Sequence, residues 1–157
     1  MKKPINEAQI IFPAKSENES FARSAVGAFC TCLDPTLEEL SDIRTAASEA
    51  VTNAIVHGYK EDGLGQVMLI LKLYENRVLE ITVRDRGCGI ENIPLCMTPL
   101  YSGDPSGERG GMGFSIMESF TDDLKVISSV GKGTTVTMIK RILPYSEIHK
   151  YEDEPRQ

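Results

Sequence analysis

The chain has 157 residues, of which 41% are hydrophobic and 25% are charged, as is usual for one globular domain with its own core. The formal net charge of -6 argues against a broad nucleic-acid-binding surface, which needs a basic face. No apolar run approaches the roughly 18 residues that a membrane helix needs, and no apolar signal core follows the first residues, so we expect a cytoplasmic protein without membrane contact.

The first third of the chain predicts one strand and two helices. Residues 9–12 form an apolar run closed by a proline, which is typical of a short strand. Ser16 and Glu19 have the spacing of a capping box, in which each side chain accepts from the other residue's backbone amide, and this predicts a helix that ends near Asp34. Apolar residues at three- and four-residue intervals predict a second, longer helix over 36–57.

The rest of the chain predicts two hairpins separated by a long loop and a helix. Alternation of apolar and polar residues around a tight turn predicts a β-hairpin over 66–84. Residues 85–110 have no periodicity and are dense in glycine and proline, and so long a connection is usually functional or disordered. We expect a helix over 111–120 and a last pair of strands within 124–141.

This order of elements predicts an α+β fold. We expect a two-layer sandwich, with the helices on one face of a mostly antiparallel mixed sheet. Residues 1–143 are expected to form a single domain, and the polar segment 144–157 is expected to be a disordered tail.

Three short segments carry residues that suit a chemical role. The first lies on the long helix, where Glu49 and Asn53 are four residues apart and therefore share a face. The Asn53 amide offers a neutral oxygen to a hard cation such as Mg²⁺, and the Glu49 carboxylate can accept a proton from an attacking hydroxyl. Taken alone, both side chains are also compatible with a solvated helix face.

The second and third segments are rich in glycine. Asp85 ends a strand and is followed by Gly87 and Gly89, so the backbone can approach a flat ligand whose exocyclic amine donates to the carboxylate. The glycines of 110–113 open a helix, whose unpaired first amides attract phosphates, and the Arg109 guanidinium precedes them. Either segment alone could be an ordinary turn, and neither matches a P-loop or a Rossmann fingerprint.

In this order, the three segments resemble the GHKL, or Bergerat-fold, superfamily of ATPases and kinases over about residues 5–142. Residues 49–58 are similar to the N box of that family, residues 85–89 to its first glycine box, and residues 111–113 to its second. Residues 133–135 resemble its final motif, whose threonine faces the nucleotide. The resemblance implies the Bergerat ATP-binding fold, with ATP or ADP and Mg²⁺ bound beneath a long ATP lid.

The resemblance also implies the roles of individual side chains. Glu49 would act as the general base toward the hydroxyl of a protein serine, Arg109 would reach the γ-phosphate, and Asn53 would hold Mg²⁺. The residues implied at the nucleotide are Asn53, His57, Asp85, Gly87, Gly89, Ile90, Gly111, Met112, Gly113, and Thr134 or Thr135. From the residues alone, His57 could also simply terminate its helix.

Within the superfamily, the chain most resembles the anti-sigma serine kinase branch of spore-forming bacteria, on residues 18–23 and 48–59. Arginine at position 109, where many relatives have glycine, favours the same branch. This branch implies a chain that sequesters a sporulation sigma factor of the F type and phosphorylates a serine of the anti-anti-sigma antagonist. It implies Arg23 as a contact for both partners, with an ordinary surface arginine as the alternative, and it suggests a homodimer that makes no direct nucleic-acid contact.

Three other functions stay open. A general-stress anti-sigma kinase of the same branch would differ only in its partners. A non-catalytic, nucleotide-dependent sigma-binding module would lack turnover, which the presence of Glu49 and Asn53 disfavours. A pure ATPase of the chaperone or mismatch-repair type needs a further domain that feeds a lysine into the site, and we expect 157 residues to be too few for one.

Overall fold

The computed structural model describes residues 3–98 and 112–144. Within these ranges the chain forms strands, α-helices and two short turns of other helix type. In chain order they are β1 (Asn6–Pro13), α1 (Glu17–Cys30), the 3-10 turn η1 (Thr31–Leu33), α2 (Leu37–Asn53), the π-helical turn η2 (Ala54–Gly58), β2 (Gln66–Tyr74), β3 (Val78–Arg84), α3 (Ile93–Cys96), α4 (Gly113–Phe120), β4 (Asp123–Ser129) and β5 (Gly133–Arg141). Residues 99–111, which include much of the loop predicted over 85–110, and residues 145–157 of the predicted tail 144–157 lie outside the described residues.

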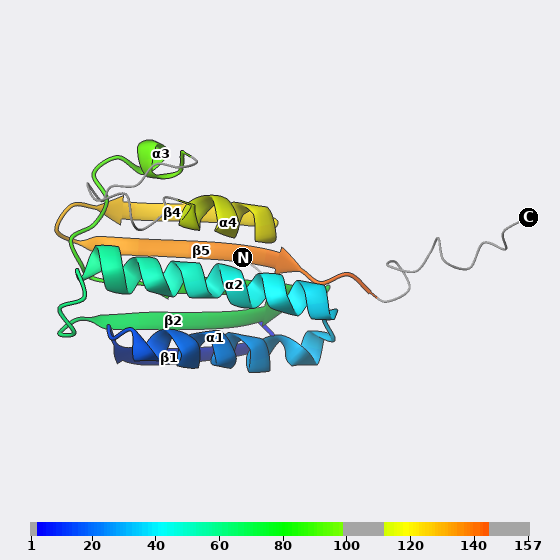
Figure 1. Ribbon diagram of the computed structural model, residues 1–157. Coiled ribbons are helices and arrows are strands. Elements are labelled where there is room, and N and C mark those ends of the chain that lie inside the picture. The colour runs from blue at the N-terminus through cyan, green and yellow to red at the C-terminus, as the bar shows by residue number, and fades with distance from the viewer. Residues whose placement is uncertain (1–2, 99–111, 145–157) are drawn as a thin grey trace, which may run out of the picture.

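The strands form one sheet in the order β1-β2-β3-β5-β4 (Figure 1). The sequence predicted a mostly antiparallel mixed sheet, and each neighbouring pair among the described strands is antiparallel. Because β5 lies between β3 and β4, the register pairs Arg84, the last residue of β3, with Thr135, near the start of β5. The next residues, Asp85 just after β3 and Thr134 on β5, are therefore neighbours, and the Asp85 amide donates to the Thr134 carbonyl at 2.9 Å.

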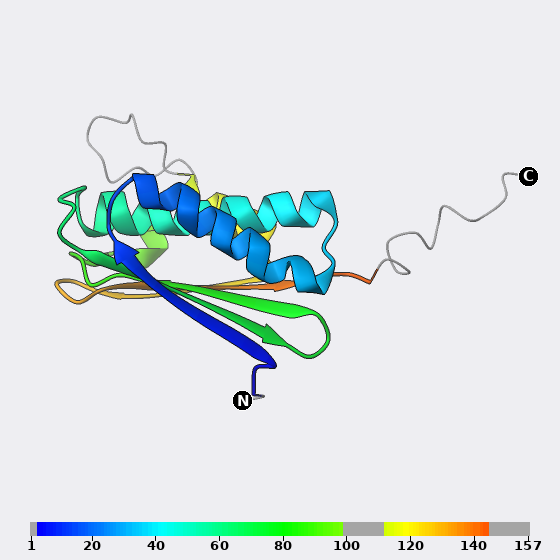
Figure 2. The ribbon, with the colours of Figure 1, turned by 90° about the horizontal axis from the view of Figure 1, so that it is seen from below.

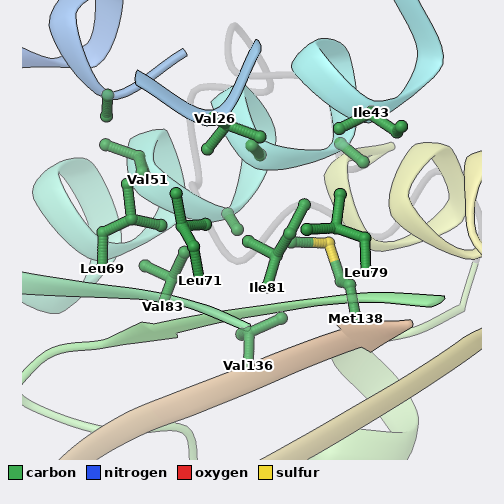
Figure 3. Packing of buried hydrophobic residues seen from close by; sticks show 14 of the residues in the cluster. Val26, Ile43, Val51, Leu69, Leu71, Leu79, Ile81, Val83, Val136 and Met138 are labelled. Atoms are coloured by element: carbon green, nitrogen blue, oxygen red, sulfur yellow. The ribbon is translucent and has the colours of Figure 1, made fainter. Parts of the chain in front are cut away.

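The longer helices all cover the same face of the sheet, and α2 lies between α1 and α4 (Figures 1 and 2). Apolar side chains from the two layers meet in one core (Figure 3). The α2 helix contributes three buried alanines to it, Ala46, Ala47 and Ala50. The largest fully buried side chains include Val26, Ile43, Val51, Leu69, Leu71, Leu79, Ile81 and Met138. Burying one such side chain contributes about 1.5–3 kcal/mol, so this core fixes α2 on the sheet. The predicted α+β sandwich is confirmed.

The predicted capping box at the start of α1 is wrong. Ser16 itself has helical backbone angles, φ -57° and ψ -32°, and its side chain caps no amide. Glu19 instead accepts a hydrogen bond of 2.5 Å from the hydroxyl of Ser48 on α2. A capping box does occur at α2, where Thr36 and Glu39 bond each other's backbone amides at 3.1 and 2.9 Å.

The long helix changes type before its end. The sequence predicted one helix to position 57, but the α-helix ends at Asn53 and a π-helical turn continues to Gly58. In this turn the amide of Tyr59 donates to the carbonyl of Ala54, five residues earlier, at 3.1 Å. Single π-helical turns are frequent at functional sites. The short helix α3, within the segment predicted as a patternless loop, was not predicted.

In the ranges 3–98 and 112–144, no helix combines the length and the hydropathy needed to cross a bilayer.

Candidate functional site

Glu49 and Asn53, which the sequence placed on one face of α2, lie against the first residue of α4. A Cβ placed on Gly113 would stand 3.1 Å from Glu49 Oε2 and 3.3 Å from Asn53 Oδ1. Both side chains are half-buried. The fold therefore brings together a carboxylate, an amide and a glycine-opened helix start that are about sixty residues apart in the sequence.

The environment of Glu49 makes its carboxylate a stronger base. Burial is the main cause of its raised pKa, and the negative charge of Glu19 raises it further. Glu19 is held in place by the Ser48 hydroxyl, and its Oε1 lies 3.7 Å from the Nε of Arg23. A carboxylate whose pKa is raised binds a proton more tightly, as a general base requires.

Asp85 is the polar anchor at the other end of the site. Only 5% of its surface is exposed, and its Oδ1 accepts from the amides of Gly87 at 2.9 Å and Thr134 at 3.2 Å. Burial raises the pKa of Asp85, and these hydrogen bonds oppose the rise. Because both bonds use Oδ1, and no residue of the described chain donates to Oδ2, the second oxygen can accept from an outside donor such as an exocyclic amine.

The glycines around Asp85 are required by close backbone packing. A Cβ on Gly87 would overlap the carbonyl oxygen of Gly58, and a Cβ on Gly58 would stand 3.1 Å from the carboxylate of Asp85. The amide of Cys88 donates to that same Gly58 carbonyl at 2.9 Å. Gly89 has a φ of +73°, which disfavours other residues, and it lies against the backbone of Ser129. The end of the long helix is thus pressed directly onto the loop that carries Asp85.

The two predicted threonines point to opposite faces of β5. Thr134 is buried on the helix-covered side, and its Oγ1 lies 2.8 Å from Oγ of Ser128. Ser128 also accepts from the amide of Ile90 at 2.8 Å, so it joins three parts of the site. Thr135 is on the other side of the sheet by alternation. Ser128 was not predicted from the sequence, because nothing in a strand sequence shows which neighbour its hydroxyl contacts.

The remaining predicted residues are placed as follows. His57 is exposed, and its carbonyl accepts from the Cys88 thiol at 3.0 Å. Met112 precedes α4 and is 46% exposed. Arg109 and Gly111 lie outside the residues that the structure describes.

These groups are spread along the axis of α2 and η2. Nine residues separate Glu49 from Gly58, which is about 13 Å at a rise of 1.5 Å per residue. The Asp85 carboxylate lies at the Gly58 end, and Gly113 lies at the Glu49 end. The donor set fits a magnesium nucleotide. Oδ2 of Asp85 is available to accept from the base of a nucleotide, and Asn53 beside Gly113 offers an amide oxygen of the kind that Mg²⁺ prefers.

Comparison with known proteins identifies the family of the chain. The family model of the histidine kinase-like ATPase domain matches residues 12–140. The chain belongs to this family. The match confirms the superfamily resemblance that residues 49–58, 85–89, 111–113 and 133–135 predicted.

Curated relatives align with most of this chain and with nearly all of their own length. The chain is 54% identical over 136 residues to a Clostridium acetobutylicum protein named anti-sigma F factor, covering 87% of this chain and 94% of the relative. It is 50% identical over 137 residues to the protein of that name from Anoxybacillus flavithermus, covering 87% of this chain and 93% of the relative. These identities relate the chain closely to the anti-sigma members of the family.

Solved structures share the fold. A structure of the RsbU and RsbW domains of a Mycobacterium tuberculosis protein aligns with a TM-score of 0.64 at 21% identity, over 88% of this chain and 32% of that one. A histidine kinase domain from Erythrobacter litoralis aligns with a TM-score of 0.54 at 20% identity, over 92% of this chain and 67% of that one. The predicted fold class is confirmed by these neighbours.

Proposed function

We propose that this chain is an anti-sigma factor and an ATP-dependent protein serine kinase of the cytoplasm. It sequesters a sporulation sigma factor and phosphorylates a serine of that factor's anti-anti-sigma antagonist. Relatives named anti-sigma F factor support the sigma-binding half of the proposal. The convergence of Glu49 and Asn53 on Gly113 supports the kinase half. A nucleotide-dependent module that only held a sigma factor would need no proton acceptor, so the half-buried carboxylate of Glu49 favours the kinase.

Glu49 is the proposed general base of phosphotransfer. It takes the proton of the serine hydroxyl while the serine oxygen bonds to the γ-phosphorus and the bond from that phosphorus to the β–γ bridging oxygen breaks. Asn53 holds Mg²⁺ through its amide oxygen, and the ion supplies neutralisation of the phosphate charge. Arg109 is proposed to reach the γ-phosphate. The base contributes about 10²- to 10⁴-fold to the rate.

The Asp85 end of the site is proposed to bind adenine. Its free Oδ2 accepts from the exocyclic amine, and the tight backbone of Gly87, Gly89 and Ile90 approaches the base closely. Thr134 is favoured over Thr135 as the threonine at the nucleotide, because Thr134 shares the helix-covered face with Asp85.

The start of α1 is proposed to dock both protein partners. The Arg23 side chain is 41% exposed and forms an ion pair with Glu19. Glu19 in turn accepts a hydrogen bond from Ser48, which precedes Glu49 on α2. A surface pocket of about 350 Å³ adjoins this pair and is lined by Ser16, Glu19, Thr52, Ile55, Val56 and Glu61. A partner held here would bring its serine near the base. Arg23→Glu is expected to weaken binding of both partners by about tenfold or more and to leave ATP affinity unchanged; unchanged partner affinity would contradict this role.

The uncovered face of the sheet is proposed to carry the homodimer contact. Ile11 on β1 and Ile127 on β4 are 50% and 56% exposed on this face, which no helix of the described chain covers (Figure 2). Light scattering should give the mass of two chains, and Ile11→Glu should lower it.

One mixture tests the function. The protein, γ-labelled ATP and Mg²⁺ are combined with a sporulation anti-anti-sigma protein or with a general-stress one. We expect label on a serine of the first partner. Label only on the general-stress partner would indicate the other kinase of the branch, free phosphate alone would indicate an ATPase, and no turnover would indicate a binding module.

A further inference from the structure

The loop that follows β3 is held by four successive backbone amides. Asp85 donates to the Thr134 carbonyl at 2.9 Å, and the Gly87 amide donates to Asp85 Oδ1 at 2.9 Å. The amide of Cys88 donates to the carbonyl of Gly58 at 2.9 Å. Between them, the amide of Arg86 donates to the Tyr59 hydroxyl at 2.7 Å. Of the four acceptors, only that hydroxyl is a side-chain group from outside the loop.

Tyr59 is itself fixed at both ends. Its hydroxyl donates to the carbonyl of Gln66, at the start of β2, at 2.7 Å. Its ring is half-buried against the core. A Cβ on Gly65 would overlap this ring, so position 65 must be glycine for the backbone to pass the ring. The amide of Tyr59 closes the π-helical turn by donating to Ala54. The hydroxyl is therefore a rigid bridge between the helix end, the start of β2 and the loop.

We propose that Tyr59 is a positioning residue for the nucleotide site, acting through the Arg86 peptide on the carboxylate of Asp85. The Arg86 amide belongs to the peptide between Asp85 and Arg86, and the Gly87 amide, which holds Oδ1 of that carboxylate, belongs to the next peptide along the chain. If the Arg86 amide loses its acceptor, the peptide between Asp85 and Arg86 can rotate, and the Gly87 amide moves with it. The free Oδ2 then loses its fixed direction toward the base. This role rests on the proposed binding of adenine at Asp85.

The test compares Tyr59→Phe with Tyr74→Phe. The control removes a tyrosine hydroxyl that donates to Glu80 at 3.2 Å, on the other face of the sheet. Calorimetry with Mg²⁺ and either ATP or GTP is run on the wild-type chain and on both variants. For Tyr59→Phe we expect ATP affinity to fall roughly three- to tenfold, the loss for one hydrogen bond of ordinary net strength. The ratio of ATP to GTP affinity should fall with it, while the rate of phosphotransfer at saturating ATP stays unchanged. Tyr74→Phe should match the wild type.

Each outcome bears on a different claim. A wild-type chain that binds no adenine nucleotide would remove the proposed site and, with it, this role. If the wild-type chain binds ATP, two results for Tyr59→Phe would overturn the role of Tyr59 alone. The variant would either bind ATP as tightly as the wild type, or lose ATP and GTP affinity in the same proportion. If Tyr59→Phe does not fold, hydrogen exchange of the backbone amides in the wild-type chain tests the role of Tyr59 instead. The Arg86 amide should be protected, and exchange at the rate of an open loop would overturn the proposal.

Discussion

Replacing Gly113 by alanine tests whether the site assembles as described. The added methyl would stand 3.1 Å from Glu49 Oε2 and 3.2 Å from Asn53 Nδ2, closer than nine in ten observed Cβ contacts, so both side chains must shift by a few tenths of an ångström. Alanine also gains up to about 1 kcal/mol over glycine in a helix, so folding should not suffer. A catalytic group tolerates a displacement of only about 0.5 Å. We therefore expect phosphotransfer to fall about tenfold while Tm stays unchanged or rises by roughly 2–4 °C.

The matched control for this variant is Gly27→Ala. Gly27 is also a helical glycine, and a Cβ there would stand 3.1 Å from Cδ of Arg44, a flexible side chain that can move away. Its phosphotransfer rate should equal that of the wild type. Transfer of γ-label to the partner serine and thermal melting are measured on both variants. A folded Gly113→Ala chain with the wild-type rate would show that α4 does not lie against Glu49 and Asn53.

Three further predictions follow from burial and close contacts. Glu49→Gln should lower phosphotransfer by about 10²- to 10⁴-fold and leave ATP binding in calorimetry largely intact. Because burial raises the pKa of Glu49, ionising it weakens folding as pH rises above the unfolded value of 4.5. The same variant should therefore melt above the wild type at neutral pH, with no difference below pH 4.5, and a wild-type advantage at neutral pH would contradict the raised pKa. Gly87→Ala, which forces a methyl into the Gly58 carbonyl, should cost about 3 kcal/mol, seen as a Tm lower by roughly 6 °C or more; an unchanged Tm would mean that the two segments are not packed together. Ile81→Ala, at a position 1% exposed, should cost about 2–5 kcal/mol in urea unfolding, and a loss below about 1 kcal/mol would place Ile81 outside the core.

Much of the fold could be predicted because its elements follow simple periods. Alternation across 66–84 predicted the hairpin, and in β2 every second residue from Val67 to Leu73 is buried. The α2 helix was predicted from its apolar repeat. The four-residue helix α3 is too short to show a period. The capping box was misplaced to Ser16 because the motif itself does not show that Glu19 meets Ser48, 29 residues away.

The site was predictable where one segment carries its own signal. Glu49 and Asn53 share a helix face, and the glycines beside Asp85 mark a close approach of backbone. The supporting residues were not predictable in this way. Ser128 reaches Ile90, and Tyr59 reaches Arg86, only because β5 is inserted between β3 and β4 and the helix ends in a π-helical turn. Neither feature has a local sequence signature.

A crystal structure with Mg²⁺ and a non-hydrolysable ATP analogue tests the central claim most directly. The account predicts one nucleotide along α2, with the adenine amine within hydrogen-bonding distance of Asp85 Oδ2, about 2.7–3.2 Å, and the phosphates beside Gly113 and Asn53. A nucleotide bound elsewhere on the chain, or one whose base lies at the Gly113 end, would contradict it.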